Sequence, residues 1–151
     1  MPVAALDAIR SRVGEEVGVS SWIMIDQIRI NAFADATEDH QFIHVDPAAA
    51  AQTSLGGTVA HGFLTLSLLS RMAAEAMLLP DTLKMAVNYG FERVRFLAPV
   101  RSGSRVRGRF RLDSIEEKAP GQILMRHSVT VEIESEEKPA LSAEWLGLMF
   151  T

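Results

Sequence analysis

The second half of the chain alternates apolar and polar residues with the period of a β-strand. Residues 105–112 place arginines at odd positions, and residues 123–134 place apolar residues and His127 at odd positions. Because successive side chains of a strand point to opposite faces, both segments predict strands with one buried and one solvated face. Pro120-Gly121 predicts a turn between them. Residues 85–100 and 141–150 are further apolar strand segments, so we expect an antiparallel sheet.

The first half is dominated by helical spacing. Apolar stripes predict helices over residues 4–13 and 28–36, and Asp26 stands at the N-cap position of the second. A short strand is expected at 22–25. Asp46-Pro47 predicts a capped helix with proline at its first position.

Residues 63–79 would be apolar on nearly every side of a helix, which predicts a buried central helix. The fold class that follows is α+β, with an antiparallel sheet around that helix.

Length and composition are those of a single globular domain over residues 1–151. The chain is 48% apolar and 23% charged, without a linker or internal repeat. We find no uninterrupted apolar run long enough for a membrane span. The sequence contains no cysteine, which excludes disulfides, thiolate metal sites and a cysteine nucleophile. Together with the lack of a signal peptide, this predicts a reducing, cytoplasmic location.

The charge is unevenly distributed. Fifteen Lys and Arg against nineteen Asp and Glu give a net charge of −4, which argues against nucleic acid or an anionic membrane as partner. Seven arginines nevertheless lie within 93–111, without an acidic residue. A hairpin register summing to about 239 would place Arg107 near Glu132 and make 105–111 a salt-bridged outer face. A track for phosphates is the alternative interpretation, and it stays open for the three arginines without such partners, Arg93, Arg95 and Arg101.

Three of the four histidines lie between residues 35 and 70. His40 and His44 have the spacing of a zinc-binding helix, but Gln41 occupies the position where that motif carries its glutamate base. We therefore expect no metal site. His127 lies on an apolar strand face and is expected to be a core histidine. Serine-hydrolase and phosphate-loop motifs are missing from the sequence.

Asp39 and His44 lie in the predicted turn between two helices. A carboxylate and an imidazole aimed at one water can remove a proton from it and return a proton elsewhere, which is what hydration of a polarised double bond requires. From spacing alone, a purely structural interpretation is equally open, in which Asp39 ends a helix and His44 is half-buried.

Four blocks of sequence, in this order, resemble the MaoC-like (R)-specific enoyl-CoA hydratase family. They are FADATEDHQFIHVDP at 33–47, AHGFL at 60–64, VNYG at 87–90 and VRFLAPV at 94–100. The resemblance implies a hot-dog fold, in which a long helix is wrapped by an antiparallel sheet. It also implies a homodimer with the acyl pocket near its interface, an acyl-CoA substrate, and neither metal nor redox cofactor.

The resemblance also assigns roles by position. Asp39 and His44 match the family's catalytic dyad, and Gly62 matches a glycine whose N–H holds the thioester oxygen. Ser70 matches a serine that supports the dyad, whereas His61 is expected to be structural. The resemblance does not assign the arginines; the charge distribution leaves Arg93, Arg95 and Arg101 as candidates for binding the phosphates of coenzyme A.

One departure concerns the turn between the dyad residues. Many family members have Asn-Pro there, and this chain has Gln41-Phe42, which resembles a nodulation-protein-N-like branch. The Gln41 amide could orient a water or the Asp39 carboxylate. The expected activity is reversible hydration of trans-2-enoyl-CoA to (R)-3-hydroxyacyl-CoA. Two alternatives are another acyl-thioester enzyme, such as a thioesterase or acyl-carrier dehydratase, and a non-catalytic acyl-CoA-binding domain.

Overall fold

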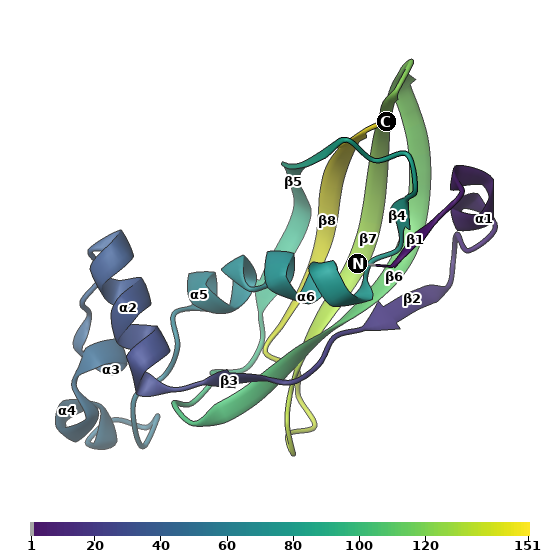
Figure 1. Cartoon of the computed structure of the whole chain (residues 1–151). Helices are drawn as coiled ribbons and strands as arrows, with labels where there is room; N and C mark the ends of the chain where they lie inside the picture. The colour runs from purple at the N-terminus through teal and green to yellow at the C-terminus, as the bar shows by residue number, and fades with distance from the viewer. Residues whose placement is uncertain (1) are drawn as a thin grey trace.

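The computed structural model describes residues 2–151 as a curved antiparallel sheet with helices across its concave face and beside one end (Figure 1). The elements in chain order are β1 (Val3–Ala4), α1 (Leu6–Arg10), β2 (Glu16–Val19), β3 (Ile23–Ile25), α2 (Gln27–Thr37), α3 (Phe42–Val45), α4 (Pro47–Ala51), α5 (Gly62–Ser67), α6 (Leu69–Ala76), β4 (Leu79–Pro80), β5 (Met85–Phe96), β6 (Ser104–Ala119), β7 (Gln122–Ile133) and β8 (Leu141–Phe150).

The main sheet has the strand order β2-β6-β7-β8-β5, and β3 pairs with β6 beyond the end of β2. All its pairings are antiparallel. A separate parallel pair joins β1 to β4. The helices α2, α3 and α4 form a group beside one end of the sheet, whereas α5 and α6 run across its face (Figure 1). The predicted α+β fold, with a sheet around a helix, is confirmed.

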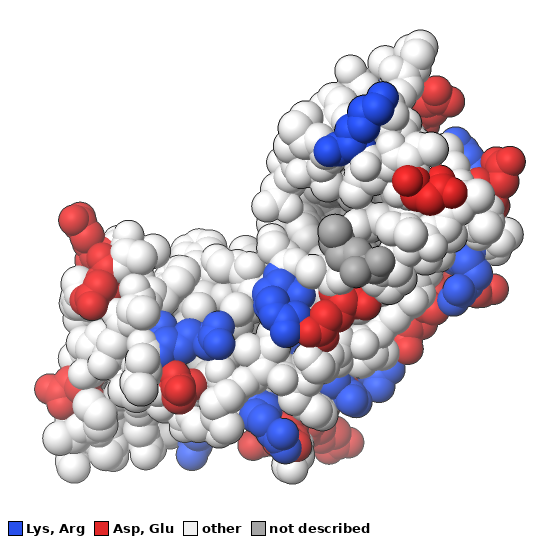
Figure 2. Space-filling view, viewed as in Figure 1, with Lys and Arg blue, Asp and Glu red and all other residues white. Residues whose placement is uncertain are grey.

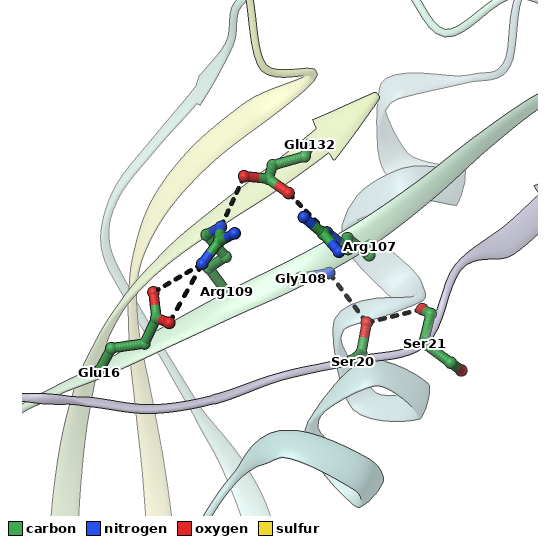
Figure 3. A network of polar contacts seen from close by, with 7 residues as sticks. All are labelled: Glu16, Ser20, Ser21, Arg107, Gly108, Arg109 and Glu132. Carbon is green, nitrogen blue, oxygen red and sulfur yellow. Dashed lines mark hydrogen bonds and ion pairs between the residues drawn. The ribbon is translucent and has the colours of Figure 1, made fainter. Parts of the chain in front are cut away.

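The hairpin register predicted from charge is also confirmed. Arg107 lies opposite Glu132, with 2.6 Å between Nε and a carboxylate oxygen. Arg109 contacts the same carboxylate at 2.6 Å and Glu16 of β2 at 3.1 Å (Figure 3). Burial opposes ionisation of Glu132, but hydrogen bonds from the two arginines lower its pKa overall. The convex face of β6 and β7 is therefore a paired, solvent-facing surface.

The core lies between the concave face of the sheet and α6. Apolar side chains at alternate strand positions are buried there, in the pattern that the sequence predicted. The fully buried ones include Phe110, Leu112, Met125 and Leu141, which share the core with Met72 of α6. This packing fixes the position of the central helix, and therefore the position of its first residue.

The central helix differs from the prediction in two ways. Residues 62–76 form two helical segments that meet at Leu68, and the helix ends at Ala76 rather than at 79. One side is also uncovered: Phe63 is 67% exposed, and Ser67, Ser70 and Arg71 are exposed as well. The prediction of a helix buried all round was wrong because the sheet covers only one side of it within this chain. The first helix is also shorter than predicted.

Strand β2 crosses α6 at very close range. A Cβ added at Gly18 would overlap the backbone carbonyl of Ala76. Just beyond, the carboxylate of Glu75 accepts hydrogen bonds from the Ser21 N–H and hydroxyl, both at 2.7 Å, and these hold the pKa of Glu75 at about 2. Ser20 meanwhile exchanges hydrogen bonds with Gly108 of β6 (Figure 3). The connection from β2 to β3 is thus fastened to both the helix and the sheet.

Among residues 2–151, no helix is long and apolar enough to cross a membrane.

The crossing of β2 over α6 predicts a specific sensitivity to a single methyl group. We expect Gly18→Ala to lower the free energy of unfolding by about 1–3 kcal/mol, because the clash is with backbone that cannot rotate away. Gly57→Ala is the control, since a Cβ there meets nothing within 4 Å. It should stay within about 0.5 kcal/mol of the parent. Urea unfolding measures both, and equal effects of the two substitutions would contradict the close crossing.

Candidate active site

Three polar side chains from separate elements come together beside the start of α5. Asp39 follows α2, after Glu38 reverses the chain in the left-handed region at φ 60°. His44 lies on α3, and His61 immediately precedes α5. Each of these three offers one donor or acceptor atom, and the three atoms lie within 4.8 Å of one another. The group comprising Asp39, His44 and His61 is called the polar triad below.

His44 is buried and held in one orientation. Its Nδ1 lies 2.7 Å from the carbonyl oxygen of Val59. Because a carbonyl can only accept, Nδ1 carries the proton of the neutral ring, and Nε2 keeps a free lone pair. The backbone of α3 is fixed as well, since Gln27 donates to the His44 carbonyl at 2.7 Å and accepts from the buried Thr58 hydroxyl at 2.6 Å. The ring is therefore oriented as a proton acceptor at Nε2.

The carboxylate of Asp39 is about half exposed. Its Oδ1 accepts the backbone N–H of Gln41 at 3.3 Å, and its Oδ2 lies 3.9 Å from Nε2 of His61. The contribution of Gln41 to the turn is thus its backbone N–H, whereas the sequence directed attention to its side-chain amide. Asp39 is accessible to water and to a ligand, while His44 approaches it from the protein interior.

His61 belongs to the same group of side chains, although it was expected to be structural. Its Nε2 lies 2.9 Å from the backbone oxygen of Asp39. Its ring stacks on that of His44 with 3.8 Å between centroids, and Phe33 packs against it at 4.9 Å. The signal available in the sequence was the position of His61 beside Gly62 in the AHG block.

The polar triad does not have the geometry of a metal site. The two imidazole planes are inclined by only 22° and are stacked. An imidazole binds a metal in its ring plane, so one ion cannot lie in both of two stacked planes. His40, the other histidine of the zinc-like spacing, instead contacts Asp35 at 2.8 Å. The donors present fit proton transfer and hydrogen bonding better than metal ligation.

Gly62 is the first residue of α5, so its N–H has no acceptor within the helix. It follows His61 directly and therefore lies next to the polar triad. A Cβ at this position would be 2.9 Å from the ring of Phe96. Glycine thus lets the β5 aromatic close over the helix start while the N–H stays at the edge of the site.

Ser70 lies elsewhere along the central helix. It lines a cavity of about 230 Å³ between α6 and the sheet, together with Asn88, His127 and Trp145. The hydrogen bonds found among residues 2–151 include none between Ser70 and the polar triad. The rest of the cavity wall is mainly apolar, and consists of Ala73, Ala74, Met77, Leu79, Ala86, Val87, Gly147 and Met149.

The three arginines proposed for phosphate binding do not form one cluster. Arg93 and Arg95 lie opposite Glu144 and Ser142 in the β5–β8 pairing, on the same side of β5. Arg101 follows β5, and its backbone forms an isolated antiparallel β-bridge with Val59, directly behind the polar triad. None of the three has a carboxylate partner within residues 2–151. Over the face shown in Figure 2, basic and acidic side chains alternate without a continuous basic surface.

The wrapped helix and the polar triad define the class of protein as a hot-dog domain with a site suited to acid–base chemistry. A family model described as "MaoC like domain" matches residues 8–135. The chain belongs to this MaoC-like dehydratase family.

Relatives within the family agree with this assignment. The chain is 54% identical to "Nodulation protein N" of Rhizobium meliloti, over 95% of this chain and 90% of that protein. It is 48% identical to "3-hydroxyacyl-thioester dehydratase Z" of Mycobacterium tuberculosis, over 90% and 89% respectively. The solved (R)-hydratase of A. caviae superposes with a TM-score of 0.71 at 24% identity, covering 87% of this chain and 95% of that one.

His127, in the cavity wall, predicts how acid weakens the fold. It is 1% exposed, and burial lowers its pKa to about 4, against about 6.5 when unfolded. The unfolded chain therefore binds a proton between these two pH values that the folded chain does not. We expect His127 to reduce the free energy of unfolding by about 3 kcal/mol as pH falls from 7 to 4.

Urea unfolding at several pH values, compared between the parent and His127→Leu, measures this contribution. The carboxylates act equally in both proteins, so the difference between the two pH slopes isolates the histidine. Identical slopes between pH 6.5 and 4 would show that His127 is not held neutral.

Proposed function

We propose that this protein is an (R)-specific enoyl-CoA hydratase, which adds water reversibly to trans-2-enoyl-CoA and gives (R)-3-hydroxyacyl-CoA. The observation that carries the proposal is the pairing of an accessible Asp39 carboxylate with an oriented His44 acceptor, beside the free N–H of Gly62. The name of the mycobacterial relative supports it, because dehydration of a 3-hydroxyacyl thioester is the same reaction in reverse.

In this mechanism a single water lies between Asp39 and Nε2 of His44. As its oxygen bonds to C3 of the enoyl group, the dyad accepts one proton from it. A proton then passes from the dyad to C2 on the same face, so one water is consumed and the dyad is regenerated. Acid–base assistance of this kind contributes about 10²–10⁴-fold in rate.

Gly62 would stabilise the charge that the reaction creates. Conjugation carries negative charge from C2 to the thioester oxygen as the C3–O bond forms, and the Gly62 N–H would donate a hydrogen bond to that oxygen. One such donor is worth about 10²–10³-fold in rate. The reaction requires no oxidant or reductant, because water supplies every atom that is added.

The cavity beside α6 is the proposed site for the acyl chain. Its alanine, methionine and leucine wall suits a hydrocarbon, and Ser70 contributes a hydroxyl group to that wall. Of the three arginines, Arg101 is best placed for coenzyme A phosphates, since its backbone pairs with the segment behind His44. Arg93 and Arg95 would serve only a carrier that extends along β5. A cytoplasmic location is part of the proposal.

A homodimer is proposed from the outer edge of β5. This strand pairs only with β8, and its other edge has no strand partner within residues 2–151. Large apolar side chains are exposed along it and on the adjoining α5: Met85, Tyr89, Phe91, Phe96 and Phe63. An uncovered apolar edge invites pairing with another strand, and a second copy offers an identical one.

The dyad makes the catalytic proposal testable by substitution. Wild-type protein should remove the conjugated enoyl absorbance of crotonyl-CoA and longer trans-2-enoyl-CoAs, and should do so after treatment with EDTA. Asp39→Asn and His44→Ala should each lower kcat by about 10²-fold or more. Asp35→Asn is the matched control and should leave kcat unchanged, because among residues 2–151 the carboxylate of Asp35 pairs with the exposed His40.

Three outcomes of that assay would overturn the proposal. They are absence of turnover at every chain length, full activity in both dyad variants, and release of free thiol in place of hydration. Free thiol would identify a thioesterase, and tight acyl-CoA binding without turnover would identify a binding domain.

The edge of β5 makes the dimer testable as well. Light scattering should give twice the 16.6 kDa mass of one chain. Tyr89→Lys, which places a charge at the 60%-exposed side chain on this edge, should shift the protein toward the monomer. Lys84→Glu, just before the strand, controls for a change of charge alone. A monomeric wild type would contradict the proposed interface.

A further inference from the structure

We propose that His61 is a positioning residue for the hydration reaction, rather than a merely structural histidine. In this role its Nε2–H holds the turn at Asp39, and the face of its neutral ring stacks on the ring of His44. The inference rests on the proposed function, because positioning has meaning only for a reaction that uses Asp39 and His44. Its evidence is separate, and consists of the contacts of His61 itself.

The first contact determines the protonation state of His61. Its Nε2 lies 2.9 Å from the backbone oxygen of Asp39, which can only accept, so Nε2 carries a proton. Its Nδ1 is buried and has no hydrogen-bond partner within residues 2–151, and the whole side chain is 3% exposed. A second proton on Nδ1 would be a buried donor without an acceptor. His61 is therefore held as the neutral tautomer with its proton on Nε2.

The same nitrogen lies near both the backbone oxygen and the carboxylate of Asp39. Nε2 lies 3.9 Å from Oδ2 of the carboxylate, in addition to its short contact with the backbone oxygen. Because Asp39 follows a left-handed residue at the end of α2, its backbone receives no support from the helix itself. His61 ties this turn to the start of α5, 22 residues later, and so sets the distance between the carboxylate and Gly62.

The second contact concerns the charge that His44 acquires. The two rings stack with 3.8 Å between centroids and an inclination of 22°. When His44 accepts a proton at Nε2, the resulting imidazolium lies against the face of a neutral ring. A neutral aromatic face attracts a cation, whereas a second charged imidazole would repel it. The tautomer fixed by Asp39 thus also keeps the partner ring neutral when the reaction needs it.

A double-mutant cycle separates positioning from general support of the fold. His61→Phe keeps the aromatic face but loses the N–H, and His61→Gln keeps an N–H donor of similar reach but loses the ring. We expect each to lower kcat about 10- to 100-fold with KM changed less than about threefold. In the Asp39→Asn background, His61→Phe should cost less than about threefold, because the carboxylate that it positions is already lost. His40→Gln is the control from the same turn, and should leave kcat unchanged.

The pH dependence of kcat/KM gives a readout that a merely structural role would not move. His61→Gln should displace the limb that reports His44, because the imidazolium loses its aromatic neighbour, whereas His61→Phe should leave that limb in place. Equal losses in both backgrounds of the cycle, together with unchanged pH profiles, would overturn the proposal. Urea unfolding of each variant shows whether a loss of activity is only a loss of folded protein.

A measurement on the resting protein needs neither variants nor turnover. Nitrogen-15 NMR of the histidine rings should find the proton of His61 on Nε2. A proton on Nδ1 in place of Nε2 would overturn the proposal even if hydratase activity is present. Conversely, absence of hydration by the wild type would remove the proposed function while leaving this tautomer to be observed.

Discussion

The packing of α6 into the concave face of the sheet is the constraint on which the rest of the molecule depends. Met72 and its apolar neighbours enter the core formed by β6, β7 and β8, and this contact fixes the axis of the central helix. The start of α5 is then placed at one end of the sheet, with Gly62 and His61 at its tip. The three residues of the polar triad lie around that tip. The position of the site therefore depends on the apolar packing of α6 against the sheet.

The polar contacts add precision to this apolar arrangement at the two ends of the helix. At its C-terminal end, Glu75 fastens the connection from β2 to β3. At its N-terminal end, the contacts of His44 and His61 with backbone oxygens fasten α3 and the turn after α2. Hydrogen bonds to buried backbone groups are directional, and individually they stabilise by about 1 kcal/mol. Their larger effect here is that the side chains of the polar triad have few alternative orientations.

Features set by neighbours in sequence could be predicted from the sequence. Strand alternation predicted which faces of β6 and β7 are buried, and opposite charges predicted the register between the two strands. Asp26 and Asp46 cap α2 and α4, as expected. The break of the central helix at Leu68 has no such local signal, since leucine favours a continuous helix. The exposure of Phe63 likewise depends on what covers the helix. Apolar periodicity does not say which elements cover each side of a helix, and in this chain the sheet covers only one side.

The candidate site divides in the same manner. The resemblance directed attention to Asp39, His44 and Gly62, which the structure places close together around the start of α5. The participation of His61 arises from a contact with a backbone oxygen 22 residues away. Every residue has such an oxygen, so the sequence contains no signal for this contact. Ser70 was expected beside the dyad, and within this chain it lines the cavity beside α6.

The left-handed conformation of Glu38 has a consequence for how the molecule could be stabilised. A residue with a Cβ in this region costs about 1–2 kcal/mol relative to glycine, and this one directly precedes the Asp39 carboxylate. Glycine at position 38 would remove that cost in the folded state, but it would also free the backbone that aims the carboxylate. The side chain of Glu38 therefore lowers the stability of the fold while it restricts the backbone that directs the Asp39 carboxylate. A sequence optimised for thermal stability alone would tend to replace Glu38 and lose that restriction.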